Sequence, residues 1–405
     1  MIHSSIYQPR VIPYNGDITS AEMDRIQELT GTITLNRTKI QEVGRDGIVG
    51  FRNSIPNATM TARQLEYGSL EFWRKISNKS DATTTINLTD FRTSAFDLVA
   101  YITDQDGTFL GTAWYPEYRC AGFGLNIGDP DALIERSFNF VGENAIMFEY
   151  GNKYFIEKRF DASGGTPETF NVTNPTPAED PDNSGQYILR VLRVRGTTTT
   201  AITYTGVAST TTFAYNSGTG NLTTHTLAGD VIKIVYSAAS YVSGGDFFVE
   251  NDSDVAGLAA DTCTILLATG NTLTRLQSVA VDVTYDRNDI REIGNKDVVA
   301  RTSRDTTVRC TLGRILETWS LEEVLRGVGG FSYGKIDVRE FLSSNTLLIR
   351  NYSDNAKGTF LMGYKFTSLS PVSVDTGAPV ADNVSQGVVL EGQDGVISSV
   401  LATIT

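Results

Sequence analysis

The sequence predicts a mainly β protein with two tandem β-barrel or sandwich domains, each carrying one short helix, and an inserted β-sandwich domain between them. Two observations support this prediction. Short runs that alternate polar and apolar residues, as half-buried strands do, are separated by Gly, Asn and Asp turn residues. Four motifs of the first half also return in the same order about 250 residues later, which indicates a duplicated domain.

The clearest repeat is a charged segment, residues 37–44, which returns as residues 287–294 with Arg, Ile, Glu and Gly at matching positions. Three further matches follow in the same order along the chain: 69–71 with 320–322, 107–110 with 358–361, and 138–142 with 388–392. The duplication sets the predicted boundaries, which are an N-terminal arm at 1–25, a first domain at 26–160, an insertion at 161–270 and a second domain at 271–405.

Each copy begins with an alternating strand, and the two copies agree in parity, since Ile33 matches Val283. A slip of one residue would turn every side chain to the opposite face, so shared parity is structural information. A short helix follows in each copy, with Ser69 and Ser320 as the expected N-caps. The remainder of each copy is predicted as a hairpin and a closing strand near 136–142 or 385–391.

The insertion starts with a loop rich in Gly and Pro and continues as short Thr-rich strands, which is typical of a small β-sandwich. Three arginines at positions 190, 193 and 195 form a local basic patch there. This patch is interpreted as a charged edge of the sandwich in preference to a site for an acidic partner. Because the two copies align without the insertion, we expect assembly not to need it.

Composition excludes several functions. The net charge of −13 disfavours avid nucleic-acid binding, which needs a basic surface. The start of the chain shows no signal-peptide pattern, and no apolar run is long enough for a membrane span. The three cysteines are scattered and are expected to be buried thiols. With two histidines and no metal-ligand spacing, we expect no catalytic triad, no metal, no cofactor and no enzyme.

The repeated charged segments are the candidate contact loops between subunits or between rings. An alternative reading remains open, in which they only satisfy a local fold constraint, with Gly for the turn, Ile for the core and a solvated Arg–Glu pair. The candidate contact residues are Arg37, Lys39, Glu42, Gly44, Arg45, Arg287, Asp289, Arg291, Glu292 and Gly294.

The order of elements in both copies resembles the major tail tube proteins of tailed bacteriophages. The resemblance covers about residues 26–150 and 276–400, and it includes the stretch at 64–73 that leads into the first helix and the closing strand at 136–143. It implies tail-tube-like domains that close into rings with a continuous β-barrel as inner wall, and rings that stack through long loops. In that family six domains make a ring, so two domains per chain imply trimeric rings with pseudo-sixfold symmetry.

The resemblance also implies the partners. These are other copies of the chain, a tape measure protein in the lumen, a sheath outside if the tail has one, and DNA that passes during ejection without specific binding. The location would be the virion tail, assembled in the host cytoplasm. Two alternatives stay open: a baseplate or tail-end ring protein with the same domain type, and a receptor-binding or glycan-binding β protein.

Overall fold

The computed structural model describes most of the chain, and the statements below concern that part only. The residues outside the description are 1–6, 15–20, 35–36, 42–47, 54–56, 104–108, 130, 143–146, 151–153, 174–175, 180–183, 197, 239–256, 268–270, 273–275, 291–299, 317–319, 327–340, 342–343 and 378–383.

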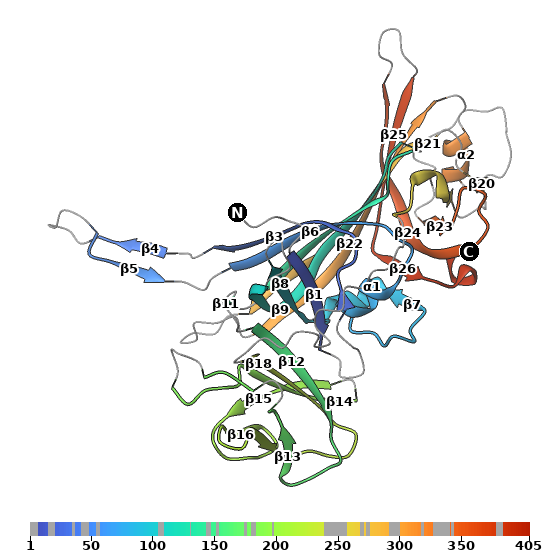
Figure 1. Ribbon diagram of the computed structural model, residues 1–405. Coiled ribbons are helices and arrows are strands. Elements are labelled where there is room, and N and C mark those ends of the chain that lie inside the picture. Colours follow the sequence, from blue (N-terminus) through green and yellow to red (C-terminus); the bar gives the residue numbers. More distant parts are fainter. Residues whose placement is uncertain are drawn as a thin grey trace.

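The predicted mainly β fold is confirmed, and its centre is one antiparallel wall to which each half of the chain contributes four strands (Figure 1). Each wall strand is hydrogen-bonded to the next one. Their order is β3 (Ile26–Thr34), β6 (Asn57–Leu65), β10 (Glu135–Gly142), β9 (Phe109–Ile127), β21 (Leu276–Ile290), β22 (Ala300–Ile315), β25 (Ser385–Gly392) and β24 (Phe360–Gly377).

The two halves of the wall share one pairing register. Ile33 lies opposite Ala58, just as Val283 lies opposite Val308, 250 positions further on. The closing strands agree in the same way, because Phe138 faces Ala62 and Phe123 while Val388 faces Leu312 and Val374. Register fixes which side chains face the core, so this agreement is the structural form of the repeat seen in the sequence.

Both long strands β9 and β24 leave the wall and enter a second sheet, so that each copy is a sandwich whose two sheets share a strand. In the first copy this second sheet contains β2 (Ala21–Glu22), β1 (Tyr7–Pro13), β8 (Phe96–Thr103) and β11 (Met147–Tyr150). In the second copy it contains β20 (Asn271–Thr272), β19 (Cys263–Leu267), β23 (Asn345–Tyr352), β26 (Asp394–Ser398) and, from the first copy, β7 (Thr85–Asn87).

Three predicted boundaries differ from the sheet assignments. Residues 154–160, which the sequence assigned to the first domain, belong to β12 (Tyr154–Asp161) of the inserted sheet. The N-terminal region is not only an arm, because β1 pairs along its whole length with β8 and Val11 is fully buried. Residues 263–267, which the sequence assigned to the insertion, form β19 and pair with β23 of the second copy. The segments that form β1 and β19 are too short or too irregular for hydrophobic periodicity to identify them as core strands.

One short α-helix lies in each copy, α1 (Glu71–Ile76) and α2 (Ser320–Arg326), as the sequence predicts. Helix α1 buries Phe72, Trp73 and Ile76, and the Trp73 ring makes edge contacts with aromatic rings of both copies. The described residues also include the 3-10 helices η2 (Leu88–Arg92), η3 (Ala260–Thr262) and η5 (Leu401–Ile404). A single hydrophobic core runs through both copies and includes Cys120 and Cys310.

The inserted domain is a separate seven-stranded sheet, drawn in green at the bottom of Figure 1. Its hydrophobic core is shared with the first copy, because Ile12, Val99, Tyr101, Phe109 and Trp114 belong to the same cluster. Its strand order is β12 (Tyr154–Asp161), β18 (Val231–Ala238), β14 (Arg190–Arg195), β15 (Thr198–Tyr204), β16 (Thr212–Asn216), β17 (Asn221–Thr224) and β13 (Glu168–Asn171). The hairpin of β4 (Arg37–Ile40) and β5 (Gly50–Asn53) projects sideways from the body, at the left of Figure 1.

Candidate assembly interface

The two copies join where β9 of the first copy pairs with β21 of the second. Six residue pairs, from Val279 opposite Ile127 to Thr284 opposite Gly122, make the junction. Val283 and Phe123, which face each other on the core side, are 1% and 2% exposed. On the other side the strands approach closely, because a Cβ atom on Gly122 would lie 2.6 Å from the main-chain oxygen of Val283. The internal junction therefore combines a main-chain ladder with tight packing on both faces.

Arg287 fastens this junction from the second copy. Its Nε and Nη2 atoms donate to the main-chain oxygen of Cys120 on β9, with Nε at 2.8 Å. Its Nη1 and Nη2 atoms also donate to the main-chain oxygens of Arg92 and Phe91, at 3.1 and 2.8 Å. These carbonyls lie at the end of η2, where a helix leaves acceptors without an internal partner. The planar guanidinium satisfies all three carbonyls with donors held in a fixed fork, a geometry that a lysine ammonium does not provide.

A cluster of buried polar side chains spans the same junction further along the wall. Glu66 and Arg136 of the first copy are fully buried, with Arg136 Nη1 3.4 Å from Glu66 Oε1. Glu66 Oε1 accepts the main-chain N–H groups of Tyr67 and Gly68 at 3.0 and 2.9 Å, and the Tyr364 hydroxyl of the second copy donates to Glu66 Oε2. Burial and the Glu66 carboxylate raise the pKa of Tyr364 far above its ordinary value, so the hydroxyl remains a donor.

Arg136 remains charged in this buried environment because its neighbours compensate the loss of water. Burial lowers the pKa of Arg136, but the Glu66 carboxylate and the two tyrosines outweigh that effect and raise it overall. The guanidinium also lies over the rings of Tyr67 and Trp73, at 4.9 and 5.4 Å from their centres, where cation–π attraction adds to the ion pair. Removing one partner would leave the other charge buried and uncompensated.

The second copy contains a similar cluster of buried polar side chains, in which the arginine and the glutamine have exchanged strands. Arg136 on β10 lies opposite Gln64 on β6, whereas Arg314 on β22 lies opposite Gln386 on β25. Arg314 donates to Gln386 Oε1 at 2.6 Å and to Glu322 Oε2 at 2.9 Å. Each copy thus buries one arginine on this pair of strands, but on opposite members of the pair.

The wall ends at two strand edges that have no neighbour among the described strands. Strand β3 pairs only with β6, and the segment of β24 from Ser370 to Gly377 pairs only with β25. The core-side residues Ile33 and Val374 at these edges are half-buried, although their counterparts Val283 and Phe123 are fully buried at the internal junction. Unpaired edges of this length are sites where another chain adds a strand.

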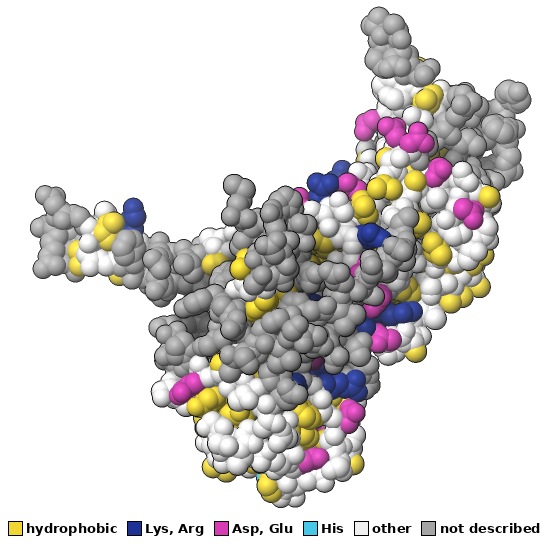
Figure 2. Space-filling model, in the orientation of Figure 1, with side chains coloured by type: hydrophobic (Ala, Val, Ile, Leu, Met, Phe, Trp, Pro, Cys, Tyr) yellow, Lys and Arg dark blue, Asp and Glu magenta, His cyan; other side chains and the backbone are white. Residues whose placement is uncertain are grey.

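One face of the wall is polar and rich in threonine, and acidic groups exceed basic ones on it. Among the side chains described on this face, the basic residues include Arg63 and Arg309, which pair with acidic neighbours across the strands, and Arg119, which lies opposite Val141. The acidic residues are Glu28, Glu135, Asp282, Asp286, Asp305, Asp375 and Glu391. Figure 2 shows acidic side chains gathered over the upper part of the molecule, where β21 and β25 lie.

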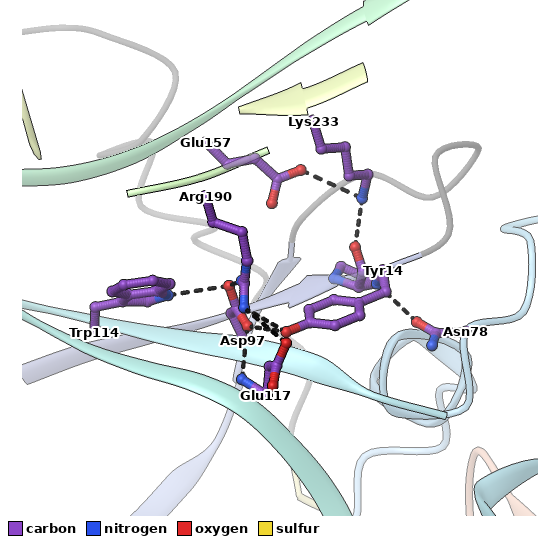
Figure 3. Close-up of polar contacts among 9 residues, drawn as sticks. Tyr14, Asn78, Asp97, Trp114, Glu117, Glu157, Arg190 and Lys233 are labelled. Carbon is purple, nitrogen blue, oxygen red and sulfur yellow. Dashed lines mark hydrogen bonds and ion pairs between the residues drawn. The ribbon is translucent and has the colours of Figure 1, made fainter. Parts of the chain in front are cut away.

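The inserted domain is fastened to the first copy by a second buried polar cluster (Figure 3). Asp97 on β8 accepts hydrogen bonds from the Tyr14 hydroxyl at 2.9 Å, Trp114 Nε1 at 3.0 Å and the main-chain N–H of Glu117 at 2.9 Å. Arg190 of the insertion forms an ion pair with Asp97 and donates to the Tyr14 hydroxyl. The interpretation of Arg190 as part of an exposed charged edge is therefore wrong.

Lys233 and Glu157, both of the insertion, add a second ion pair of 3.3 Å, and Lys233 also donates to the main-chain oxygen of Pro13. Burial lowers the pKa of Lys233 and of Arg190. Burial also raises the pKa of Glu157, and Lys233 offsets part of that rise. Because β1 lies between the insertion and the wall domain, these contacts fix the N-terminal strand together with the inserted domain.

The structure places the predicted contact residues as follows. Arg287 lies at the internal junction, and Lys39 is an exposed residue of β4. Arg37 lies in β4 and Asp289 in β21, and the structure describes the backbone of each. The other predicted residues fall outside the described part of the chain, namely Glu42, Gly44, Arg45, Arg291, Glu292 and Gly294.

Sequence reasoning missed Glu66, Arg136, Asp97 and Tyr364. The available signal was charge inside apolar alternation, since Arg136 and Asp97 stand at core positions of strands that are otherwise hydrophobic on that side. Within the described residues no group of three or more His, Cys, Asp or Glu side chains is placed to hold a metal ion. The described helices include none that is long and apolar enough to cross a membrane.

Comparisons with known proteins give little. No protein-family model matches the chain, and no curated protein matches it. One similar solved structure is a cryo-EM structure of the anti-feeding prophage (AFP) baseplate, 6-fold symmetrised. The similarity has a TM-score of 0.26 and 12% sequence identity over 36% of this chain and 92% of that chain.

The buried group at the internal junction yields a first prediction. Glu66→Ala should lower the free energy of unfolding by about 3–5 kcal/mol, because Arg136 would remain buried without its partner. Tyr364→Phe, which removes one hydroxyl, should cost about 1 kcal/mol. Urea denaturation of the purified variants measures both values. Glu28→Gln is the matched control, because its pair with Arg63 is more than half exposed and should contribute less than about 1 kcal/mol.

A second prediction concerns removal of the inserted domain. Tyr154 pairs with Ala238, so a turn of roughly four residues can replace 155–237. This deletion removes Arg190 from Asp97, and adding Asp97→Asn should restore part of the lost stability. The remainder comes from Val99, Tyr101 and Trp114, which lose their apolar contacts with the inserted domain. Replacing 165–270 instead also removes β19 and should cost about 2–5 kcal/mol more for each of the buried Leu266 and Leu267. Thermal unfolding compares the three proteins, and equal stability of both deletions would contradict the assignment of β19.

Proposed function

We propose that this chain is a structural subunit of a phage tail tube, which closes into rings by repeating its internal domain junction between chains. The observation that carries the proposal is the match between the wall's two ends and its centre. The wall begins with β3, the counterpart of β21, and ends with β24, the counterpart of β9. A second copy can therefore add its β3 to β24 in the way that β21 adds to β9.

The shared register specifies the pairing between chains. At the internal junction Val283 lies opposite Phe123 and Thr284 opposite Gly122. Transfer through the repeat places Ile33 of one chain opposite Val374 of the next, and Thr34 opposite Ser373. The core-side parity is preserved, so the half-buried Ile33 and Val374 side chains would become buried together.

A contact from one end of a chain to the other end of the next is heterologous, and such contacts form closed rings when the rotation returns on itself. Two tube domains per chain and six domains per ring make three chains. With neighbouring strands 4.7–4.9 Å apart, a wall of three times eight strands has a backbone diameter of about 37 Å before strand tilt widens it. Such a barrel leaves an open channel, whereas a barrel of about eight strands is filled by side chains.

The polar face of the wall is suited to line this channel. Its opposite face holds the core, so closing the sheet puts the threonines and the excess of carboxylates inside. Carboxylates repel phosphate groups, and a lumen without attraction for the backbone lets DNA pass without binding. The tape measure protein would occupy the same lumen before ejection, and the inserted domains would project outside, where a sheath would lie if the tail has one.

Stacking of rings is assigned to the projecting β4–β5 hairpin. It exposes Ile40, Ile48 and Val49, an apolar patch that has no partner within the described residues, and Ile290 is exposed at the corresponding position of the second copy. A patch of aliphatic residues on a protruding hairpin is suited to a contact with another subunit. A baseplate ring would use the same closure without continued stacking, so single rings in place of tubes would favour that alternative.

The proposal predicts the stoichiometry. Native mass spectrometry or cryo-EM of the assembled protein should show three chains per ring, an inner wall that looks sixfold and an outer surface that looks threefold. The first and second copies should alternate around the wall. Six chains per ring, or an inner wall made from only one of the two copies, would be incompatible with closure through β3 and β24.

Cysteine cross-linking tests the register directly. Residues opposite each other in neighbouring antiparallel strands have Cβ atoms near the distance that a disulfide needs. Ile33→Cys with Val374→Cys should therefore give covalent trimers on a non-reducing denaturing gel. Ile33→Cys with Asp375→Cys is the matched control, because these side chains would point to opposite faces. Equal cross-linking of both pairs would show that the register is different.

A further inference from the structure

The function of Arg37 can be inferred from that of Arg287. In the internal junction, the Arg287 guanidinium donates to three main-chain carbonyls of the preceding domain, those of Cys120, Phe91 and Arg92. No other side chain described at this junction binds so many main-chain carbonyls of the opposite copy. Arg287 thus fixes β21 against both β9 and the end of η2, at the point where the ladder between the copies ends.

Arg37 has the corresponding backbone position in the first copy. It lies opposite Asn53 in the β4–β5 hairpin, and Arg287 lies opposite Ser303, which follows Asn53 by the same 250 positions. The next pairs agree as well, down to Ile40 opposite Gly50 and Ile290 opposite Ala300. The hairpin that projects from β3 is thus the counterpart of the hairpin that continues β21, with an arginine at the same place.

Two of the three acceptor carbonyls also have counterparts in the described part of the second copy. Phe91 corresponds to Phe341, within the matched runs Asp90–Phe91 and Glu340–Phe341. Cys120 corresponds to Pro371, since Cys120 lies opposite Phe140 and Pro371 lies opposite Leu390. Proline lacks a main-chain N–H but keeps its carbonyl, so this position can still accept a hydrogen bond. Phe341 is half-buried at the edge of the common core.

We propose that Arg37 is the latch between chains: it donates to the main-chain carbonyls of Phe341 and Pro371 of the neighbouring subunit, as Arg287 does within the chain. The inference rests on the proposed ring closure and names a residue that holds it. Arg37 then acts within a ring, and the contact between rings belongs to the remainder of the projecting hairpin.

The test compares three alanine variants of the full-length protein by sedimentation velocity over a range of concentrations. Arg37→Ala should raise the concentration for half-assembly at least tenfold, while the thermal unfolding of the dissociated chain stays unchanged. Arg287→Ala should lower the unfolding temperature of the chain itself, because its bonds lie within one chain. Arg159→Ala is the control, since Arg159 is an exposed cation of the inserted domain, away from the proposed contacts between chains, and should have no effect.

Two further variants make the outcome decisive. Arg37→Lys retains the charge but loses the planar fork, so assembly should remain weakened if the hydrogen-bond geometry is what matters. The Ile33→Cys/Val374→Cys disulfide should restore rings to Arg37→Ala, which shows that the variant folds. If Arg37→Ala forms closed rings at the wild-type concentration, the proposed role of Arg37 is wrong. It is also wrong if the Arg37→Ala rings close normally and only the tubes built from them are shorter. Wild-type protein that never forms rings overturns both the latch and the proposed function.

Discussion

Main-chain pairing between β9 and β21 is the interaction on which the rest of the structure depends. It converts two sandwich domains into one continuous sheet, and it occupies one edge of each copy while leaving the other edge open. Strand edges are directional and have a fixed register, so the pairing determines both where a further copy can attach and which side chains then become buried. The hydrophobic core follows the sheet across the junction instead of stopping at a domain boundary.

The sequence predicted the elements that are periodic or repeated. Duplication, strand parity at Ile33 and Val283, the two short helices and the burial of Cys120 and Cys310 all follow from local pattern. Pattern could not identify β1 and β19 as sheet strands, because their neighbours β8 and β23 are distant in sequence. Nor could it show that the copies share one sheet, since nothing local to β9 or β21 encodes a partner about 150 residues away.

The candidate site likewise contains residues that the sequence identified and residues that it did not. The repeat identified Arg287, but not its carbonyl partners, which come from a 3-10 helix and a strand of the other copy. The polar residues at Glu66, Arg136 and Asp97 were not selected, because a charged residue in a strand is usually exposed. Their burial depends on tertiary contacts, with Tyr364 and Arg190 supplied by other parts of the chain. Such clusters cost desolvation energy, and their value lies in accepting only one arrangement of the parts.

The exchanged arginine and glutamine pairs restrict which segments the two copies can exchange by recombination. Arg136 faces Gln64 and Gln386 faces Arg314, in matching registers on adjacent strands. A recombination event that copied one strand into the other half without its neighbour would set arginine against arginine, or glutamine against glutamine. The first product would bury two like charges and the second would leave Glu66 or Glu322 without a cation. These strands can therefore be exchanged only as pairs, and this preserves a difference between the halves that recombination of single strands would erase.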